Sequence, residues 1–228
     1  MREDLVATNC SGIKPDAHVY RVFPFHRALE LFLQKKLTLV RPRLWDDPFE
    51  NFLHRCRVTR SLGGRSLDLE LAKQEAQFFG QCWTTKRESD ALWRIYASQK
   101  DGVRLRSTPR KLITELYSDP IDDFVKLKLW IGKVAYVSQQ TIERKFRGPG
   151  WFRQKALDSL GRGQFEALLI KRREFQHERE VRLLYRDIDG TSRGNVVSFP
   201  VDIDRALDEV TLDPRMPDAL CEAIRMGA

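Results

Sequence analysis

Short segments with the character of β-strands alternate irregularly with short amphipathic segments along most of this chain. The first kind is rich in β-branched and aromatic residues, and the second repeats apolar residues at helical spacing. We expect strands at residues 18–23, 37–42, 78–85, 101–106, 130–137, 180–187, 195–201 and 207–214, and helices at 27–36, 67–77, 89–98, 108–117, 152–174 and from 217. No strand–helix repeat is present, so the pattern predicts an α+β fold with one mixed, largely antiparallel sheet and flanking helices. Strands 180–187 and 195–201 are expected to pair around the Asp189-Gly190 turn.

Length and composition favour one domain. The chain has 228 residues, of which 42% are hydrophobic and 32% charged, and this is enough to bury one substantial core. Residues 1–17 are polar and turn-rich, so we expect a flexible N-terminal segment followed by a single α+β domain over residues 18–228.

Neither a signal peptide nor an apolar run of the roughly 20 residues that span a bilayer is evident. We therefore expect a cytoplasmic protein with no membrane partner. The four cysteines are scattered, which predicts neither a disulfide framework nor a zinc ribbon. His54 and Cys56 lie close together, but no second ligand pair accompanies them, so no metal is expected.

The chain carries 40 lysine and arginine residues against 32 aspartate and glutamate residues, a formal net charge of +8. This excess favours an anionic partner such as a nucleic acid or a phosphate-bearing cofactor. The basic residues are dispersed, however, and solvated helix faces have the same composition.

The segment REFQHEREVRLLY (173–185) places glutamates among basic residues beside an apolar strand. If the apolar residues share one face of the strand, the two-residue period places Glu178, Glu180 and Arg182 on the other. Carboxylates held in this way form either a charge ladder on an exposed edge strand or a functional site. Common nucleotide-binding and hydrolase motifs, including Gly-x-Gly-x-x-Gly, the Walker loop, His-Glu-x-x-His and the nucleophile elbow, are absent from the sequence.

Several motifs occur in an order that resembles a widespread bacterial family, the domain of unknown function numbered twenty-nine seventy-one. They are VYRVFPF, RPRLWDDPFEN, CWTT, LWRIYASQKDGVRL, KVAYV, KRREFQHEREVRLLY and DEVTLDP, and they span roughly residues 18–226. The chain departs from the family pattern at Asp46, where asparagine is frequent, and at Thr84, where serine is frequent. The resemblance implies no activity by name, so function has to be sought in the site.

The chain also resembles the ADP-ribosyltransferases of the Arg, Ser/Thr, Glu type. These enzymes have a basic residue on a first strand, a hydroxyl residue on a middle strand and a Glu-x-Glu motif on a late strand. The pattern falls on Arg21, Thr84, Glu178 and Glu180. This resemblance implies a split sheet, NAD as substrate, and transfer of ADP-ribose to a nucleic acid or a protein, as in a toxin or an antiphage effector.

These residue types suit that chemistry. Cleavage of the nicotinamide–ribose bond builds positive charge on the ribose, which Glu180 would stabilise, while Glu178 would position the acceptor. Arg21 would anchor phosphate or ribose oxygens, and Thr84 would orient the glutamate.

The aromatic residues Trp83, Trp93 and Tyr96 would stack on the nicotinamide or a base. We also expect a substrate loop at the same cleft, formed by Asp46, Asp47 and Glu50 together with Arg182.

Each residue also has a purely structural interpretation. Trp93 and Tyr96 have the spacing of a buried helix face, and Arg21 suits a solvent-facing strand position. Thr84 is ordinary strand composition, and turn formation alone explains Asp47.

Two functions therefore remain open, an NAD-dependent ADP-ribosyltransferase and a non-catalytic nucleic-acid-binding module whose basic surface and aromatic residues contact phosphates and bases. A metal-dependent nuclease built on the acidic cluster is a third. The sequence predicts neither the acceptor nor the oligomeric state. The transferase requires Arg21, Thr84 and Glu180 to meet at one cleft.

Overall fold

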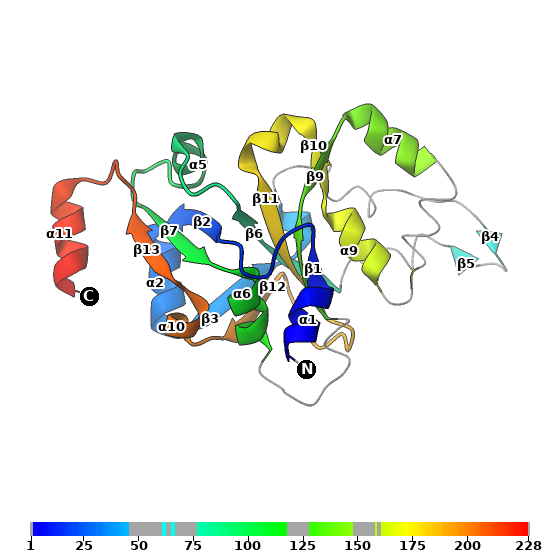
Figure 1. Ribbon diagram of the computed structural model, residues 1–228, viewed down its shortest axis with the longest axis horizontal. Helices are drawn as coiled ribbons and strands as arrows, with labels where there is room; N and C mark the ends of the chain where they lie inside the picture. The colour runs from blue at the N-terminus through cyan, green and yellow to red at the C-terminus, as the bar shows by residue number, and fades with distance from the viewer. Residues whose placement is uncertain are drawn as a thin grey trace.

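The computed structural model describes residues 2–45, 61–62, 65–66, 77–117, 128–147, 158 and 161–227. Its centre is a nine-stranded, mostly antiparallel sheet flanked by helices (Figure 1), which confirms the predicted α+β fold. The strands follow the order β1-β8-β11-β6-β2-β7-β13, and β3, with β12 beside it, branches from β6.

The strands of this sheet are β1 (Cys10–Ser11), β2 (Val19–Pro24), β3 (Lys36–Val40), β6 (Phe78–Thr84), β7 (Gly102–Ser107), β8 (Leu129–Lys133), β11 (Glu180–Arg186), β12 (Val196–Pro200) and β13 (Glu209–Leu212). Two small sheets pair β9 (Ala135–Val137) with β10 (Ile170–Arg172), and β4 (Ser61–Leu62) with β5 (Arg65–Ser66). The helices are α1 (Arg2–Asn9), α2 (Phe25–Gln34), α5 (Asp90–Tyr96), α6 (Pro109–Leu116), α7 (Gln139–Arg147), α9 (Arg162–Leu168), α10 (Ile203–Ala206) and α11 (Asp218–Gly227), with 3-10 turns η1 (Pro42–Leu44) and η3 (Arg173–Glu178). No described helix has the length and apolar character to cross a membrane.

Helix starts follow the signals in the sequence. The Ser89 side chain caps α5 by accepting a hydrogen bond from the Leu92 N–H at 3.4 Å, and Thr108 caps α6 through the Lys111 N–H at 3.2 Å. Pro109 occupies the first turn of α6, where its missing N–H costs nothing. These caps confirm the predicted N-termini of the two helices.

Strand β11 is central in the sheet, between β8 and β6, and its residues Glu180–Leu184 are buried on both faces. Val181 and Leu183 face the larger core, to which α1, α2, α6 and α10 contribute, whereas Leu184 faces a smaller core with Phe165 of α9. An exposed charge ladder needs a solvated strand face. The ladder interpretation of residues 178–182 is therefore wrong.

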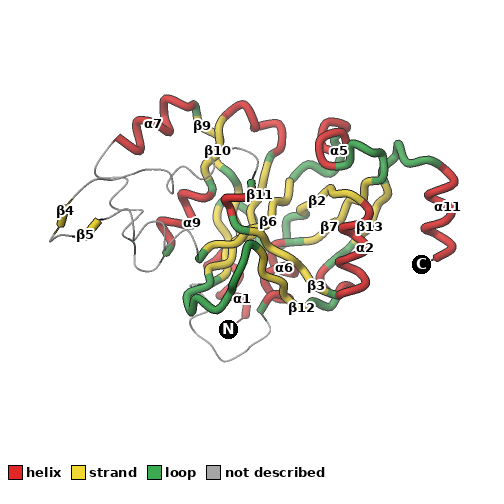
Figure 2. The backbone as a smooth tube through the Cα atoms, turned by 180° about the vertical axis from the view of Figure 1, so that it is seen from behind, coloured by secondary structure: helices red, strands yellow, loops and turns green. Residues whose placement is uncertain are grey.

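The sheet divides at β6. This strand pairs with β11 along its whole length, but with β2 only where Tyr20 lies opposite Thr84, and with β3 only where Val40 lies opposite Gly80. One branch is β2-β7-β13 and the other is β3-β12, as seen from behind in Figure 2. The short ladder between β2 and β6 leaves room for a site between these strands.

The N-terminal segment differs from our expectation of a flexible extension. Within residues 2–11, α1 and β1 form, and β1 pairs in parallel with β8. Val6 packs into the larger core, and buried Asn9 donates a hydrogen bond from Nδ2 to the Leu129 carbonyl at 2.7 Å. These partners lie far away in the sequence, so polar local composition did not reveal them.

Three local predictions also differ from the structure. The strand expected over 130–137 is interrupted at Val134 and becomes β8 and β9, in different sheets. Helix was expected to continue to residue 174, but the chain forms β10 and η3 there. Strands β11 and β12 form as expected but do not pair with each other. Strand β11 pairs with β6 and β8, whereas β12 pairs with β3. The expected helix over residues 67–77, apart from Gln77, and the pair His54 and Cys56 lie outside the described residues.

Candidate active site

A cavity of about 160 Å³ lies between β2 and β6, beside α5 and η3. Its lining contains most of the predicted site residues, contributed by five separate elements: Arg21, Trp83, Thr84, Tyr96, Glu178 and Glu180. Arg21, Thr84 and Glu180 thus share one cavity, as a transferase site requires, although the functional role of each stays a prediction.

The junction between η3 and β11 places both glutamates at this cavity. Arg179 adopts a left-handed conformation with φ of 44°, which ends η3 and turns the chain into β11. The Thr84 hydroxyl donates a hydrogen bond to the Glu178 carbonyl at 2.5 Å, and the Thr85 N–H donates to the Arg179 carbonyl at 3.0 Å. Thr84 therefore holds the backbone of this turn, whereas we expected it to orient a carboxylate directly.

Two carboxylates and two cations form a buried cluster. Arg182, with 0% of its surface exposed, binds Glu180 through Nε at 2.8 Å and Nη2 at 3.0 Å. The Nζ of Lys171 donates to Oε2 of Glu178 at 2.6 Å and to Oε2 of Glu180 at 3.2 Å. The formal charges balance, which is the condition under which four ionised groups can be buried together.

Glu180, only 3% exposed, stays ionised in this cluster. Burial alone would raise its pKa, but the charges and hydrogen bonds of Arg182, aided by Lys171 and the Cys82 thiol, lower the pKa to about 2. A carboxylate whose pKa is lower in the folded state stabilises that state above the pKa of the unfolded chain.

We expect this stabilisation, about 3 kcal/mol at neutral pH, to be lost as the pH falls from about 4.5 to about 2. Urea unfolding of the wild type and Glu180→Gln at several pH values tests this. The difference in unfolding free energy between the two proteins should shrink as the pH falls through this window. A difference independent of pH would contradict the ion-paired state of Glu180.

Tyr96 joins the cluster to the mouth of the cavity. Its hydroxyl donates to Oε1 of Glu178 at 3.3 Å, and 39% of its surface is exposed. Burial of the hydroxyl and the nearby Glu178 charge raise the pKa of Tyr96, so the group remains a hydrogen-bond donor. Among the predicted aromatic residues, Tyr96 is the one with an accessible ring.

Arg21 lies half-buried in the cavity lining, with its guanidinium 5.2 Å from the centre of the Phe23 ring. It makes no hydrogen bond or ion pair with any residue in the described part of the chain. Burial lowers the pKa of Arg21 to about 10, so it is still charged at neutral pH. A cation that is partly desolvated without a partner favours binding of an anionic or hydroxyl-rich ligand.

Several predicted residues have other roles. Trp93 is 2% exposed, donates its indole N–H to Glu88 at 2.6 Å, and does not line the cavity, so a stacking role does not fit it. The Trp83 ring packs in the larger core and donates to Gln81 at 2.8 Å. Arg182, expected in a substrate loop, is instead the buried partner of Glu180.

The other members of the expected substrate loop, Asp46, Asp47 and Glu50, lie outside the described residues. Trp45, which precedes them, stacks on the Arg182 guanidinium with 4.3 Å between the guanidinium carbon and the ring centre. The described chain therefore reaches the charge cluster immediately before this loop.

Sequence reasoning missed Lys171 and Cys82. Lys171 lies on β10, and because helix was expected there, its orientation toward the glutamates could not be inferred. Cys82 lines the cavity two residues before Thr84 on the same strand, so the period that grouped Glu180 with Arg182 would have found it.

Comparisons with protein-family models, curated proteins and solved structures found no match for this chain. Among the described residues, no group of three or more His, Cys, Asp or Glu side chains is placed to hold a metal ion. The interpretation of the site therefore rests on its own geometry.

Proposed function

We propose that this protein cleaves the nicotinamide–ribose bond of NAD and transfers ADP-ribose to an acceptor. The observation that carries the proposal is the meeting at one cavity of Arg21, which has no hydrogen bond or ion pair to a described residue, and two ionisable carboxylates, Glu178 and Glu180. Anion recognition and stabilisation of a developing cation are the two requirements of this reaction.

In the proposed reaction the C1′–N bond breaks, its electron pair leaves with the nicotinamide, and positive charge develops on the ribose. Oε1 of Glu178 has the long hydrogen bond from Tyr96, while Oε2 is held by Lys171. This makes Oε1 the oxygen best placed to accept a hydrogen bond from the ribose or the proton of the attacking acceptor. Glu180 keeps Lys171 in position, while Arg182 compensates the charge of Glu180 itself.

The size of the cavity limits which part of NAD is enclosed. Pockets that enclose a whole small ligand typically have about 300–1,000 Å³. A volume of about 160 Å³ suits the nicotinamide–ribose end, and the rest of the dinucleotide would lie along the open mouth beside Tyr96.

Nicotinamide release from NAD, measured with purified protein in buffer and with added cell extract as the acceptor source, tests the proposal. We expect Arg21→Gln to raise the KM for NAD by about tenfold or more, because a charge-assisted contact is lost. Its melting temperature should stay equal to that of the wild type or rise, because an unpartnered cation is costly to desolvate.

Arg94→Gln is the matched control. Arg94 is also an arginine near the site, but it is exposed on α5 and paired with Asp90. Unchanged kinetics in Arg21→Gln together with a lower melting temperature would assign Arg21 a structural role. Absence of both NAD binding and nicotinamide release in the wild type would refute the proposed function.

A further inference from the structure

Two segments beside the cavity carry exposed or partly exposed basic side chains that we call the basic rim: Lys86, Arg87, Arg173 and Arg179. Lys86 and Arg87 follow the end of β6, while the other two begin and follow η3. The N–H and hydroxyl of Thr85 both donate to the Arg179 carbonyl, at 3.0 and 3.4 Å, and join these segments. Figure 1 shows α5 and the helical turn between β10 and β11 along the same edge of the molecule.

Both segments of the basic rim adjoin residues that line the cavity. The cavity lining includes Thr84, which precedes the first segment. It also includes Glu178 and Glu180, which flank Arg179. The Arg179 side chain is exposed while the glutamates on either side of it are buried. A ligand held on the basic rim would therefore lie beside the carboxylates.

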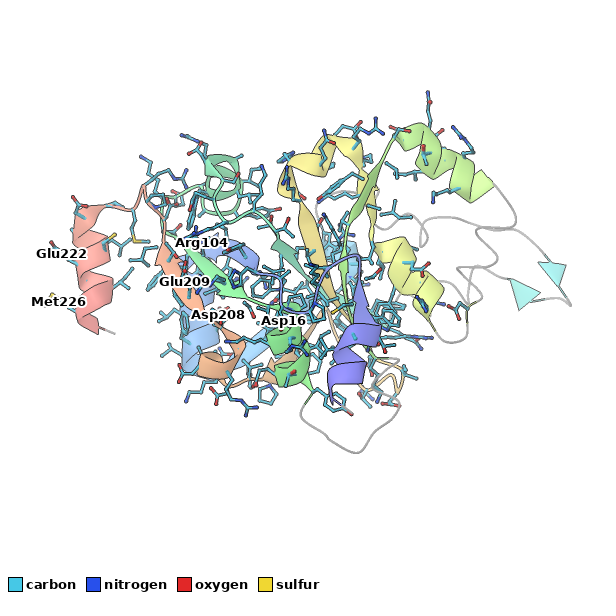
Figure 3. All side chains as sticks on the ribbon, viewed as in Figure 1. Asp16, Arg104, Asp208, Glu209, Glu222 and Met226 are labelled. Carbon is cyan, nitrogen blue, oxygen red and sulfur yellow. The ribbon has the colours of Figure 1, made fainter. Side chains whose placement is uncertain are left out.

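The charges of the basic rim are available to a partner. Arg87, Arg173 and Arg179 are exposed and Lys86 is partly exposed, and none of the four makes an ion pair within the described ranges. Some basic residues elsewhere on the fold are neutralised, as Arg104 is by Glu209 at 2.9 Å (Figure 3). Of the exposed acids on the same two segments, Glu88 is bound to Arg104, and Glu174 on η3 offsets only part of the positive charge.

We infer that the basic rim binds single-stranded nucleic acid and presents it to the cavity as the acceptor of ADP-ribose. The lysine and arginine side chains of the basic rim, none of which has an ion pair within the described residues, suit a chain of phosphates. Tyr96, which lines the cavity and is 39% exposed, offers an aromatic side chain on which a base can stack. A single strand is favoured over a duplex because its unpaired bases are free to stack on Tyr96 beside the cavity.

This inference rests on the proposed function only in making the nucleic acid the acceptor; the binding itself does not require NAD. It is tested by fluorescence anisotropy without NAD, using labelled single-stranded RNA, single-stranded DNA and duplex DNA of about 12 nucleotides. With four phosphate contacts, affinity for a single strand should fall about fiftyfold between about 50 and 200 mM salt.

The double variant Arg173→Gln/Arg179→Gln should bind a single strand about tenfold or more weakly at low salt, with a salt dependence about half as steep. The control Lys36→Gln/Arg193→Gln removes the same charge from residues that do not belong to the basic rim, and should bind as the wild type does. The RNA and DNA arms distinguish which backbone is preferred.

Equal loss of binding in both double variants would show a general charge effect and overturn the inference, as would tighter binding of duplex. Nicotinamide release stimulated by nuclease-treated cell protein, without nucleic-acid binding, would assign a protein acceptor instead. Salt-dependent binding through the basic rim with no nicotinamide release would contradict only the proposed function and leave a binding module.

Discussion

Replacing Glu178 by glutamine should slow nicotinamide release by about a hundredfold or more, the usual cost of removing one well-placed electrostatic group from a reaction site. Glutamine keeps the size of the side chain and one hydrogen-bonding oxygen, but it removes the charge and the proton acceptor. Because Lys171 retains its contact with Glu180, the buried cluster should remain folded. Release rates and thermal melting are measured on the same preparations.

Glu174→Gln is the matched control for this variant, since Glu174 lies on the same turn η3 but is exposed. Its release rate should equal that of the wild type. If Glu178→Gln retains full activity while Glu180→Gln loses it without a change in melting, Glu180 is the group that stabilises the ribose cation. Full activity in both variants would remove the carboxylates from the reaction.

Replacing Arg182 by methionine should lower the free energy of unfolding by about 3–5 kcal/mol, the range found when one partner of a buried ion pair is removed. Glu180 would keep Lys171 but lose its bidentate partner, and the Leu168 carbonyl would lose the hydrogen bond from Arg182. The stacking contact with Trp45 would also lose its charge. Urea unfolding at neutral pH provides the measurement.

The double variant Glu180→Gln/Arg182→Met separates charge from packing. With both partners removed, Lys171 still pairs with Glu178, so no buried charge is left uncompensated. The decrease in the free energy of unfolding should therefore be smaller in the double variant than the sum of the decreases in the two single variants. Additive effects would show that Arg182 stabilises the fold through packing alone. Because Glu180 belongs to this buried pair, the stability of Glu180→Gln has to be measured beside its activity.

Local signals in the sequence determined the type and position of many elements. These signals are the strand-like residue pattern of β2, β6 and β11 and the capping residues of α5 and α6. Each acts over a few residues, so it can be recognised without knowledge of the fold. The resemblance to Arg, Ser/Thr, Glu transferases selected residues that share a cavity, and the two-residue period placed Glu180 with Arg182 on one face of β11.

Only the tertiary structure decided whether those charges are exposed or buried. Strand pairing depends on contacts between distant segments, and the central position of β11, between β8 and β6, turned an apparent surface ladder into a buried ion-pair cluster. The same long-range pairing ordered α1 and β1 against β8 and brought Lys171 of β10 between two glutamates. Desolvation and ion pairing then set the protonation of Glu180, because both depend on what packs around a carboxylate rather than on its neighbours in the chain.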